Sequence, residues 1–369
     1  MTAAQLTAAQ SQGVLARPGD AIGLLGGGQL GRMLALAAAD LGFDVHVFAP
    51  DKDCPASRVA RKTWIAPYDD RAALLEFSAS VKVVTIEFEN IPVDAVDAIA
   101  AAGTPVRPDA RSLAVSQDRL AEKSFLRDIG VEPAPFVRVD KADQIQAALD
   151  QLGGSGVLKT RFSGYDGKGQ IRLSGQIQPA AAWAEMQGGR SILEAWIEHD
   201  REISVLLARG ADGEVAAYDP PENVHSGGVL RRSTFPSTVP TALLAEATRL
   251  ARRLAEELNY VGVLALELFV TKDGRLLANE FAPRVHNSGH WTQDACRTGQ
   301  FEQHIRAVCG WPLGDPARHS DGEMINLLGT EIHDWPRHAA DGAKVHLYGK
   351  RRTADGRKMG HLVRLRPKS

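Results

Sequence analysis

Two glutamates, Glu267 and Glu280, lie in apolar runs on either side of Asp273 and Gly274. An Asp-Gly pair between apolar runs is typical of a two-residue hairpin turn, and counting outward from it places Glu267 directly opposite Glu280. Carboxylates that face each other on apolar strands repel, and a bridging divalent cation would remove the conflict. The pattern predicts a magnesium site completed by water and phosphate oxygens. The alternatives are that this face is open to solvent or that one carboxyl is protonated.

The segment that follows Glu280 is dense in hydrogen-bond donors. It contains Arg284, His286, Asn287 and Ser288. A loop that leaves a metal-binding strand with these side chains is placed to hold an anion at a reacting phosphate. The alternative is an ordinary loop in which Asn287 and Ser288 cap a helix.

A glycine-rich segment follows Lys159, which ends an apolar run. Its glycines would let backbone N–H groups wrap around a polyphosphate, while Lys159 and Lys168 would supply positive charge. It is not a P-loop, because Gln170 stands where that motif requires lysine followed by serine or threonine. A flexible hairpin tip is the alternative. The segment consists of Gly164, Tyr165, Asp166, Gly167, Lys168, Gly169 and Gln170.

Another glycine cluster, at residues 26–31, fits the pattern G-x-G-x-x-G between a predicted strand and a predicted helix. Free N–H groups at such a turn favour an anion. A dinucleotide would also need an acidic residue near the end of the second strand, and Asp51 or Asp53 could serve. Since glycines permit any tight turn, the cluster is compatible with a ligand phosphate or with a purely structural role.

A basic turn lies near the C-terminal end, around Asp355 and Gly356. Its cations could clamp a phosphate monoester, bind nucleic acid or simply be solvated. No aromatic residues are interleaved with them to stack on bases. The cations are Lys350, Arg351, Arg352, Arg357 and Lys358.

The elements that must position these residues change in type along the chain. An apolar run at 21–25, helical spacing at 30–41 and further apolar runs at 45–48 and 81–86 predict strands and a helix of a parallel α/β sheet. A mixture of strands and a helix then predicts an α+β domain, with strands at 157–158, 191–193, 203–207 and 263–270 and a helix at 242–258. Short strands at 324–328 and 345–348 suggest a small terminal module.

Composition excludes several classes of protein. The chain has 369 residues, with 43 basic and 45 acidic side chains, so its net charge of −2 argues against bulk attraction to nucleic acid or membranes. Its three cysteines, Cys54, Cys296 and Cys309, form no C-x-x-C pair, which favours a reducing cytoplasm over a disulfide or zinc framework. No apolar run has the length of a signal peptide or membrane span.

Taken together, the motifs resemble one family, the 5-(carboxyamino)imidazole ribonucleotide synthases of purine biosynthesis. The resemblance covers about residues 20–361. It is carried by GGGQLGRM at 26–33, EFEN at 87–90, QDR at 117–119, GYDGKGQ at 164–170, YVGVLALELFV at 260–270, NEFAPRVHNSGHWT at 279–292, HLYGK at 346–350 and GRKMGH at 356–361.

The resemblance implies an ATP-grasp architecture that combines α/β and α+β parts. After a flexible tail at 1–19, we expect an N-terminal parallel-sheet domain, the pre-ATP-grasp domain, at 20–115. A central two-subdomain ATP-grasp domain would follow at 116–315, with a lid at about 133–197, and a small β-rich domain at 316–369. The resemblance also implies a homodimer.

The resemblance further implies a reaction. ATP, bicarbonate and 5-aminoimidazole ribonucleotide would give the carbamate of the amine, ADP and phosphate through carboxyphosphate, with ATP and magnesium as cofactors. Three rival functions are a sibling ATP-grasp ligase that joins another carboxylate to another amine, a nicotinamide-dependent oxidoreductase, and a nucleic-acid module. The second leaves the lysine and glutamate motifs unexplained, and the near-neutral charge opposes the third.

Residue roles follow from the same resemblance. The implied nucleotide contacts are the whole 164–170 segment with Arg119, Lys159, Glu194, Ala195, Trp196, Ile197, Glu202, His225, Asn279 and Glu280. The implied metal ligands are Glu267 and Glu280. The residues implied to hold bicarbonate or carboxyphosphate are Arg284, His286, Asn287, Ser288 and Lys350. The residues implied to lie near the aminoimidazole ribonucleotide are Gln29, Glu87, Asp166, Lys168, Arg284, Lys350, Arg357 and Lys358, and Asp166 could orient the amine.

Overall fold

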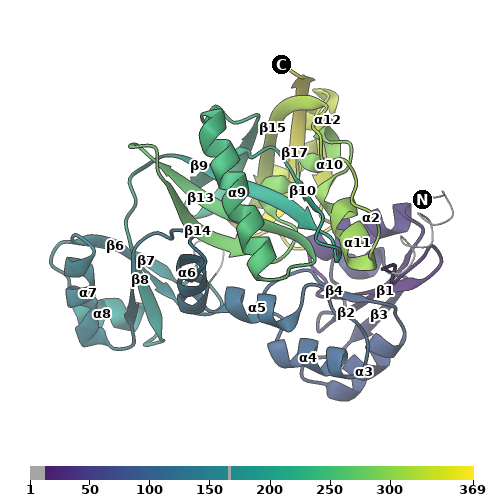
Figure 1. Ribbon diagram of the computed structural model, residues 1–369, viewed down its shortest axis with the longest axis horizontal. Coiled ribbons are helices and arrows are strands. Elements are labelled where there is room, and N and C mark those ends of the chain that lie inside the picture. Colours follow the sequence, from purple (N-terminus) through teal and green to yellow (C-terminus); the bar gives the residue numbers. More distant parts are fainter. Residues whose placement is uncertain (1–12, 165–167) are drawn as a thin grey trace.

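The computed structural model describes residues 13–164 and 168–369, and it divides them among three sheets. Figure 1 shows a broad central body, an N-terminal sheet beneath it and a small sheet that projects to one side. Among the described residues, no helix combines the length and the apolar character needed to cross a membrane.

The N-terminal sheet is parallel throughout, as the sequence predicts. Its strand order is β3-β2-β1-β4. The strands are β1 (Ala21–Leu25), β2 (Asp44–Ala49), β3 (Lys62–Ile65) and β4 (Val84–Ile86), and the helices beside them are α2 (Gln29–Asp40), α3 (Arg71–Ala79) and α4 (Val93–Ala101). Because parallel strands end at one edge of a sheet, the glycine turn after β1 and the acidic segment after β4 lie close together.

The predicted flexible tail is wrong for its described part, residues 13–19. The Leu15 N–H donates to the Cys309 carbonyl at 2.8 Å, and the Trp311 indole N–H donates to the Ala16 carbonyl at 2.9 Å. Ala16 is fully buried in the cluster that also contains residues of α2 and α11 (Gln300–Cys309). These contacts with the far end of the chain hold the segment in place, and no spacing in the sequence announces them.

The central sheet has nine strands and includes the C-terminal strands. Along it the order is β14-β13-β9-β11-β12-β15-β17-β16, and β10 pairs separately with β9. The pairing of β12 with β15 joins the predicted terminal module to this sheet. The bounds are β9 (His199–Arg209), β10 (Val215–Ala217), β11 (Glu222–Ser226), β12 (Val229–Phe235), β13 (Gly262–Thr271), β14 (Leu276–Ala282), β15 (Ser320–Leu328), β16 (Lys344–Leu347) and β17 (Lys358–Pro367).

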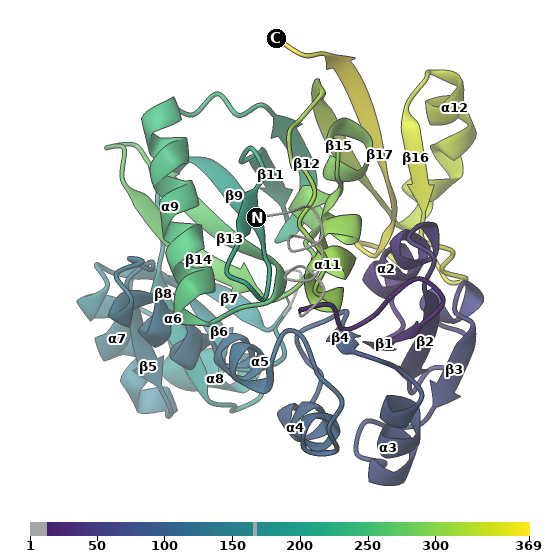
Figure 2. The ribbon, with the colours of Figure 1, turned by 45° about the vertical axis from the view of Figure 1, so that its right-hand side comes forward.

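Helices cover the central sheet and link it to its neighbours (Figure 2). The predicted helix at 242–258 is confirmed as α9, which packs on β9 and β13 through an apolar stripe. On the other face α11 lies between β13 and α2. The helices are α5 (Ala110–Gln117), α6 (Arg119–Asp128), α9 (Thr241–Glu257), α10 (Thr292–Ala295) and α12 (Trp335–Ala340), with short 3-10 turns at Ala56–Arg58, Ala142–Gln144, Asn287–Gly289 and Gly329–Asp334.

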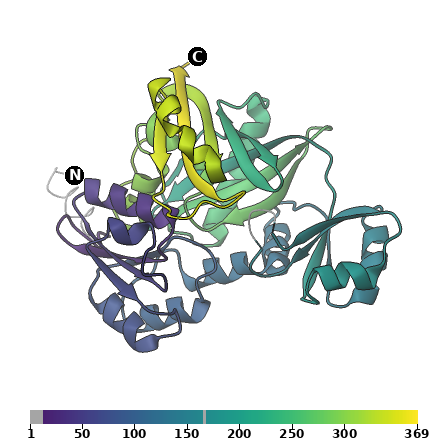
Figure 3. The ribbon, with the colours of Figure 1, turned by 180° about the vertical axis from the view of Figure 1, so that it is seen from behind.

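The projecting sheet is the part predicted as a lid. Its strands are antiparallel in the order β5-β8-β6-β7, and two helices form a small core with them. Figure 3 shows it extending from the body. The Ala134 N–H donates to the Ala278 carbonyl at 3.0 Å and ties its entry to β14. The elements are β5 (Phe136–Val139), β6 (Ser155–Thr160), β7 (Gln170–Ser174), β8 (Ser191–Ala195), α7 (Ile145–Gln151) and α8 (Pro179–Glu185).

The β13–β14 hairpin corrects one prediction. The Thr271 N–H donates to the Arg275 carbonyl at 2.9 Å, so the loop has three residues rather than two and ends at Gly274, whose φ is 78°. Near the loop the register is therefore shifted by one residue. A bulge between Leu266 and Leu268 restores it and leaves both Asn279 and Glu280 opposite Glu267. The two carboxylates meet as predicted, although the turn by itself would have misaligned them.

The apolar stripe of α9 gives a test of this packing. Leu254 is fully buried against β9 and β13, so Leu254→Ala should leave a cavity and lower the free energy of unfolding by about 2–5 kcal/mol. Arg252→Ala, an exposed change on the same helix, should shift it by less than about 0.5 kcal/mol. Urea unfolding followed by circular dichroism measures both, and equal losses would contradict the assignment of the buried face.

Candidate functional site

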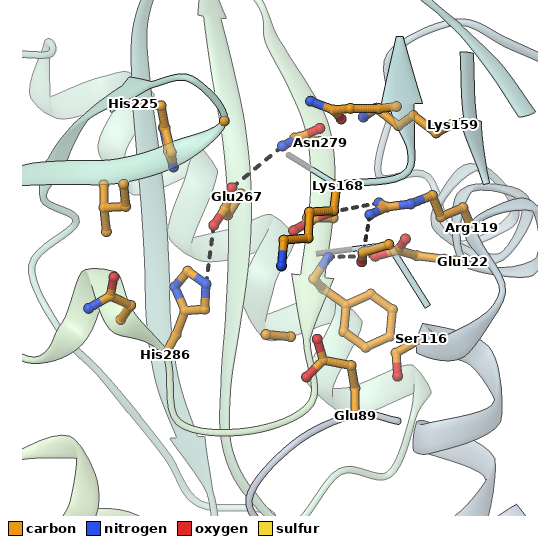
Figure 4. Close-up of a pocket in the computed structure, with 18 of the residues that line it drawn as sticks. Glu89, Ser116, Arg119, Glu122, Lys159, Lys168, His225, Glu267, Asn279 and His286 are labelled. Atoms are coloured by element: carbon orange, nitrogen blue, oxygen red, sulfur yellow. Dashed lines mark hydrogen bonds and ion pairs between the residues drawn. The ribbon is translucent and has the colours of Figure 1, made fainter. Parts of the chain in front are cut away.

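A cavity of about 710 Å³ lies where the three sheets meet, and it gathers most of the residues singled out in the sequence. Figure 4 shows how some of them converge. The predicted residues that line it are Gln29, Glu87, Arg119, Lys159, Gly164, Lys168, Gln170, Glu194, Ala195, Trp196, Ile197, Glu202, His225, Glu267, Asn279, Glu280, Arg284, His286, Asn287 and Lys358.

Several predicted residues lie elsewhere. Gly169 and Ser288 are not among the lining residues, and the Ser288 hydroxyl lies 2.8 Å from His286 Nδ1. Lys350 donates to the Lys358 carbonyl at 2.7 Å. Arg357 is exposed and donates to the Arg352 carbonyl at 2.8 Å. Tyr165, Asp166 and Gly167 fall outside the described residues.

The two glutamates of the hairpin occupy one wall in different electrostatic settings. Arg119 Nη1 lies 2.7 Å from Glu280 Oε2, and although burial opposes it, the charges of Arg119 and Lys159 hold the pKa of Glu280 at about 2. Burial and the charge of Glu280 raise the pKa of Glu267 to about 7. The Asn279 amide donates to Glu267 Oε2 at 3.4 Å, and Figure 4 shows Asn279 and His286 both pointing at this carboxylate. Glu267 is thus a buried acid whose ionised form needs a further positive charge.

A buried ion-pair network connects the projecting sheet to this wall. Lys159 Nζ lies 2.9 Å from Glu194 Oε2, and Lys123 Nζ lies 3.1 Å from the same oxygen. Lys123 also donates to the Asn279 carbonyl at 2.7 Å and is fully buried. Sequence analysis missed Lys123, because a lysine on a helix is normally a solvated residue. The network joins β6 and β8 to α6 and β14.

A second residue missed from the sequence also acts on β14. Glu122 of α6 is buried, and its Oε1 accepts a hydrogen bond from the Phe281 N–H at 2.6 Å. Burial and the charge of Glu280 raise the pKa of Glu122 to about 8. The contact fixes the strand directly after Glu280. The helix α6 therefore helps to position the acidic wall, which is formed by Glu267 and Glu280.

The donor loop after β14 faces the same wall. Arg284 makes a two-pronged ion pair with Glu89, in which Nη2 donates to Oε1 at 3.0 Å. Sequence analysis singled out Glu87 rather than Glu89, although both belong to the EFEN segment at the carboxyl end of β4. His286 Nε2 lies 3.2 Å from Glu267 Oε1, and burial together with Arg284 lowers the pKa of His286 to about 3. The loop therefore combines a fixed guanidinium with a neutral imidazole.

The glycine turn of the N-terminal sheet binds a carboxyl group from the chain itself, and burial raises the pKa of this group, Glu87. The Gly28 N–H donates to Glu87 Oε1 at 2.5 Å, and the Gly31 N–H donates to Glu87 Oε2 at 2.8 Å. These contacts favour the structural alternative for this turn over a ligand phosphate. Asp53, one of the two acidic residues offered for a dinucleotide site, forms ion pairs with Arg58 at 3.0 Å and Arg351 at 2.7 Å.

The far end of the cavity carries a histidine and carboxylate cluster. His225 Nδ1 lies 2.5 Å from Glu202 Oε2, and His199 Nε2 lies 3.1 Å from Glu202 Oε1. Burial opposes the charge on His225, but its contact with Glu202 and the charge of Glu267 leave its pKa raised. Burial also opposes the charge on Glu202, but its contacts with His225 and His199 outweigh this and lower its pKa. The pair is therefore charged over a wider pH range than either group alone.

Family models match three consecutive stretches of the chain. Residues 20–117 match the ribonucleotide synthetase preATP-grasp domain, residues 124–301 the ATP-grasp domain, and residues 323–368 the phosphoribosylaminoimidazole carboxylase C-terminal domain. The N-terminal sheet, the central region with its projecting sheet, and the last strands fall within these stretches in turn.

The chain is also similar over most of its length to named proteins. It is 49% identical to the N5-carboxyaminoimidazole ribonucleotide synthase of Brucella melitensis, covering 96% of this chain and 98% of that protein. The corresponding enzyme of Bacillus subtilis is 41% identical, covering 94% and 91%.

Solved structures of similar proteins agree with this. One is an ADP complex of an N5-carboxyaminoimidazole ribonucleotide synthetase, with a TM-score of 0.92, 38% identity, and 96% and 94% of the two chains covered. Another is the Aspergillus clavatus enzyme in complex with ADP and 5-aminoimidazole ribonucleotide, with a TM-score of 0.86, 27% identity, and 94% of each chain covered.

The His225–Glu202 pair should make stability depend on pH. The pKa of His225 is higher in the folded protein than its value of 6.5 in the unfolded chain. The pair therefore stabilises the fold fully below pH 6.5, and this contribution is lost as the pH rises through the pKa of the folded state. His225→Gln should therefore lower the free energy of unfolding by about 1 kcal/mol at about pH 6 and by less at about pH 9, since both side chains are partly exposed. Urea titrations at both pH values measure this. His333→Gln, an exposed change, should show no such dependence, and a larger loss at high pH would contradict the assignment.

Proposed function

The chain belongs to the family of N5-carboxyaminoimidazole ribonucleotide synthases, and from this membership we propose that it carboxylates the amine of 5-aminoimidazole ribonucleotide with bicarbonate and ATP. The single observation that carries the proposal is the convergence, in one cavity, of the acidic hairpin, the lysines of the projecting sheet and the donor loop. These are the parts that a phosphoryl transfer to bicarbonate needs.

The nucleotide would lie between the central and projecting sheets. The contacts that we propose for it are Arg119, Lys159, Glu194 to Ile197 along β8 and its end, Glu202, His225, Asn279 and the 164–170 segment. In support, Arg119 and Lys159 are held by Glu280 and Glu194 at the cavity wall, so their charges are fixed in position before phosphate arrives. Relatives have been solved with ATP and with ADP.

Magnesium fits the acidic wall. Glu267 and Glu280 offer carboxylate oxygens from paired strands that line the cavity, and the raised pKa of Glu267 indicates that a nearby cation would favour its ionised form. Two carboxylates are the usual protein share of a magnesium site that also binds phosphates. Bound there, the ion would neutralise charge on the phosphates of ATP.

The donor loop would hold the acyl part of the reaction. Bicarbonate oxygen attacks the γ-phosphoryl group, the bond from that group to ADP breaks, and carboxyphosphate forms. Arg284, His286 and Asn287 line the cavity beside the acidic wall, where they would bind the oxygens of bicarbonate and carboxyphosphate. The bidentate contact with Glu89 keeps the Arg284 guanidinium in one orientation, which favours a fixed anion.

The amine substrate would approach from the side of the N-terminal sheet. Gln29, Glu87 and Lys358 line that side, and Lys168 reaches the cavity from the projecting sheet. Lys350 and Arg357 contribute to this substrate's phosphate site in our proposal, supported by their place in the basic turn beside Lys358. Carboxyphosphate breaks its bond between carbon and the bridging oxygen and yields carbon dioxide and phosphate. The amine attacks the carbon of carbon dioxide and loses a proton, to Asp166 or to the released phosphate. A homodimer in the cytoplasm completes the proposal.

ADP release tests the proposed function. Purified protein with ATP, magnesium and bicarbonate should release ADP much faster when 5-aminoimidazole ribonucleotide is added, and an acid-labile carbamate should accumulate. No stimulation, in protein that still binds magnesium and ATP, would reject this substrate and favour a sibling ligase that uses another carboxylate and amine.

The acidic wall gives a second prediction. Glu267→Gln keeps the shape of the side chain but removes one charge from the proposed metal site, so ADP release should fall on the order of hundredfold. Raising the magnesium concentration should recover part of the loss. Glu246→Gln, the same change on the exposed face of α9, should leave turnover unchanged. Near-normal turnover of Glu267→Gln would exclude this glutamate as a metal ligand.

A further inference from the structure

A buried row of small polar side chains leads across the central sheet to His286. Ser233 of β12 donates to Asn223 Oδ1 at 2.7 Å, and Asn223 of β11 donates through Nδ2 to Ser204 Oγ at 3.0 Å. Ser204 of β9 donates to Ser288 Oγ at 2.7 Å, and Ser288 Oγ lies 2.8 Å from His286 Nδ1. The three serines are fully buried and Asn223 is 5% exposed, so solvent does not offer them other partners.

The donors and acceptors of this row fix which ring nitrogen of His286 carries the proton. The backbone N–H of Ser288 also points at Nδ1, at 3.4 Å, and a backbone N–H can only donate. Nδ1 is therefore an acceptor. On the other side of the ring, Nε2 lies 3.2 Å from Glu267 Oε1, and in the ionised form that the proposed metal site needs, this carboxylate can only accept. Both sides of the ring agree on a hydrogen at Nε2.

The amide of Asn223 gives the row its direction. Its oxygen accepts from Ser233 and its NH2 group donates to Ser204, so the Ser204 hydroxyl is left to donate onward. Ser288 Oγ accepts that hydrogen bond, and its own hydroxyl donates a hydrogen bond to Nδ1 of His286. The Ser204 and Ser288 hydroxyls each accept once and donate once, and the whole row runs toward the ring.

We propose that Ser204, Asn223 and Ser233 are positioning residues that hold His286 as the tautomer with its proton on Nε2. This inference rests on the proposed function for its catalytic consequence. His286 then presents a hydrogen-bond donor to an oxygen of bicarbonate or carboxyphosphate, and it does not serve as the base for the amine. A ring fixed in one tautomer needs no rearrangement as charge develops on that oxygen, which is the advantage of a preorganised donor.

Asn223→Asp should reverse the row. Aspartate offers two acceptors and no donor, so the Ser204 hydroxyl turns toward it, Ser288 donates to Ser204, and Nδ1 of His286 must donate to Ser288. Nitrogen-15 NMR of histidine-labelled protein, with His286→Gln to identify the signal, should show the proton on Nε2 in the unchanged protein and a shift toward Nδ1 in Asn223→Asp. We expect kcat for ADP release to fall about tenfold to hundredfold. The KM for ATP should stay near its original value, because the row ends at the donor loop rather than at the proposed nucleotide contacts.

Two further variants keep the test decisive. Ser112→Ala removes another fully buried serine hydroxyl, on α5, that has no hydrogen-bond partner among the described residues. It should leave kcat and the His286 signals unchanged. If Asn223→Asp does not fold, Ser204→Ala interrupts the row at its centre and should produce a mixture of tautomers with a similar loss of kcat.

Three results would overturn the inference. One is a proton on Nδ1 of His286 in the unchanged protein. Another is a variant of the row with ring signals and kcat equal to those of Ser112→Ala. The third is a fall in kcat with no change at the ring. If instead the unchanged protein releases no ADP in response to the aminoimidazole ribonucleotide, the proposed function fails, while the ring signals still decide the tautomer.

Discussion

Two carboxylates that line one cavity wall from the paired strands β13 and β14 set the central electrostatic problem of this molecule. Burial penalises the charged form of both Glu267 and Glu280, and the charge of Glu280 adds to this penalty at Glu267, so ionising them needs nearby positive charge. At Glu280 the positive charge comes from Arg119 of α6 and Lys159 of β6, which stabilise the ionised carboxylate. For Glu267 the fold provides only neutral donors, Asn279 and His286, and a histidine cluster farther away. Because of this difference, a bound cation would stabilise the ionised form of Glu267 more than that of Glu280.

The same problem explains why the cavity is assembled from distant parts of the chain. Arg119 meets Glu280 across 161 positions, and Arg284 meets Glu89 across 195. The Arg284–Glu89 pair joins the central sheet to the N-terminal sheet, and the Arg119–Glu280 pair joins α6 to β14, so the charges at the cavity are also contacts that hold these elements in position. A buried pair that loses one partner leaves an uncompensated charge, which is strongly destabilising. Changes to these cations should therefore affect stability as well as turnover.

The sequence predicts features that depend on local spacing. The parallel unit at the N-terminus, the helix α9 and the strands of the acidic hairpin all follow from periodicity, because one buried face imposes a regular pattern. The bulge opposite Glu267 does not follow from periodicity. Its position depends both on the three-residue loop and on the pairing of β13 with β9. The contact between Glu87 and the glycine turn could not be predicted either, because Glu87 is far away in sequence and reaches Gly28 only when β4 lies beside β1.

Buried polar partners are the least predictable class. Lys123, Ser204 and Asn223 stand singly among apolar or helical neighbours, and a single polar residue carries no spacing that indicates its partner. Their roles emerge from the sheet itself, where Ser204 on β9 pairs in register with Glu267 on β13, and Asn223 on β11 pairs with Ser233 on β12. Ser204 thus lies directly beside the acidic wall, and its hydrogen bond from Asn223 continues the neutral support onto β11 and β12.

The neutral character of that support has a physical reason. A protonated histidine at position 286 would add a second cation beside Arg284 within a buried space, and burial together with that neighbour opposes it. A serine and asparagine row delivers a directed hydrogen bond without any net charge, so it fixes the ring and leaves the balance between the acidic wall and the surrounding cations unaltered. A carboxylate in place of Asn223 would orient the ring too, but it would add a further buried negative charge close to two that already repel each other. A row of neutral dipoles is therefore the arrangement that orients His286 with the smallest electrostatic cost.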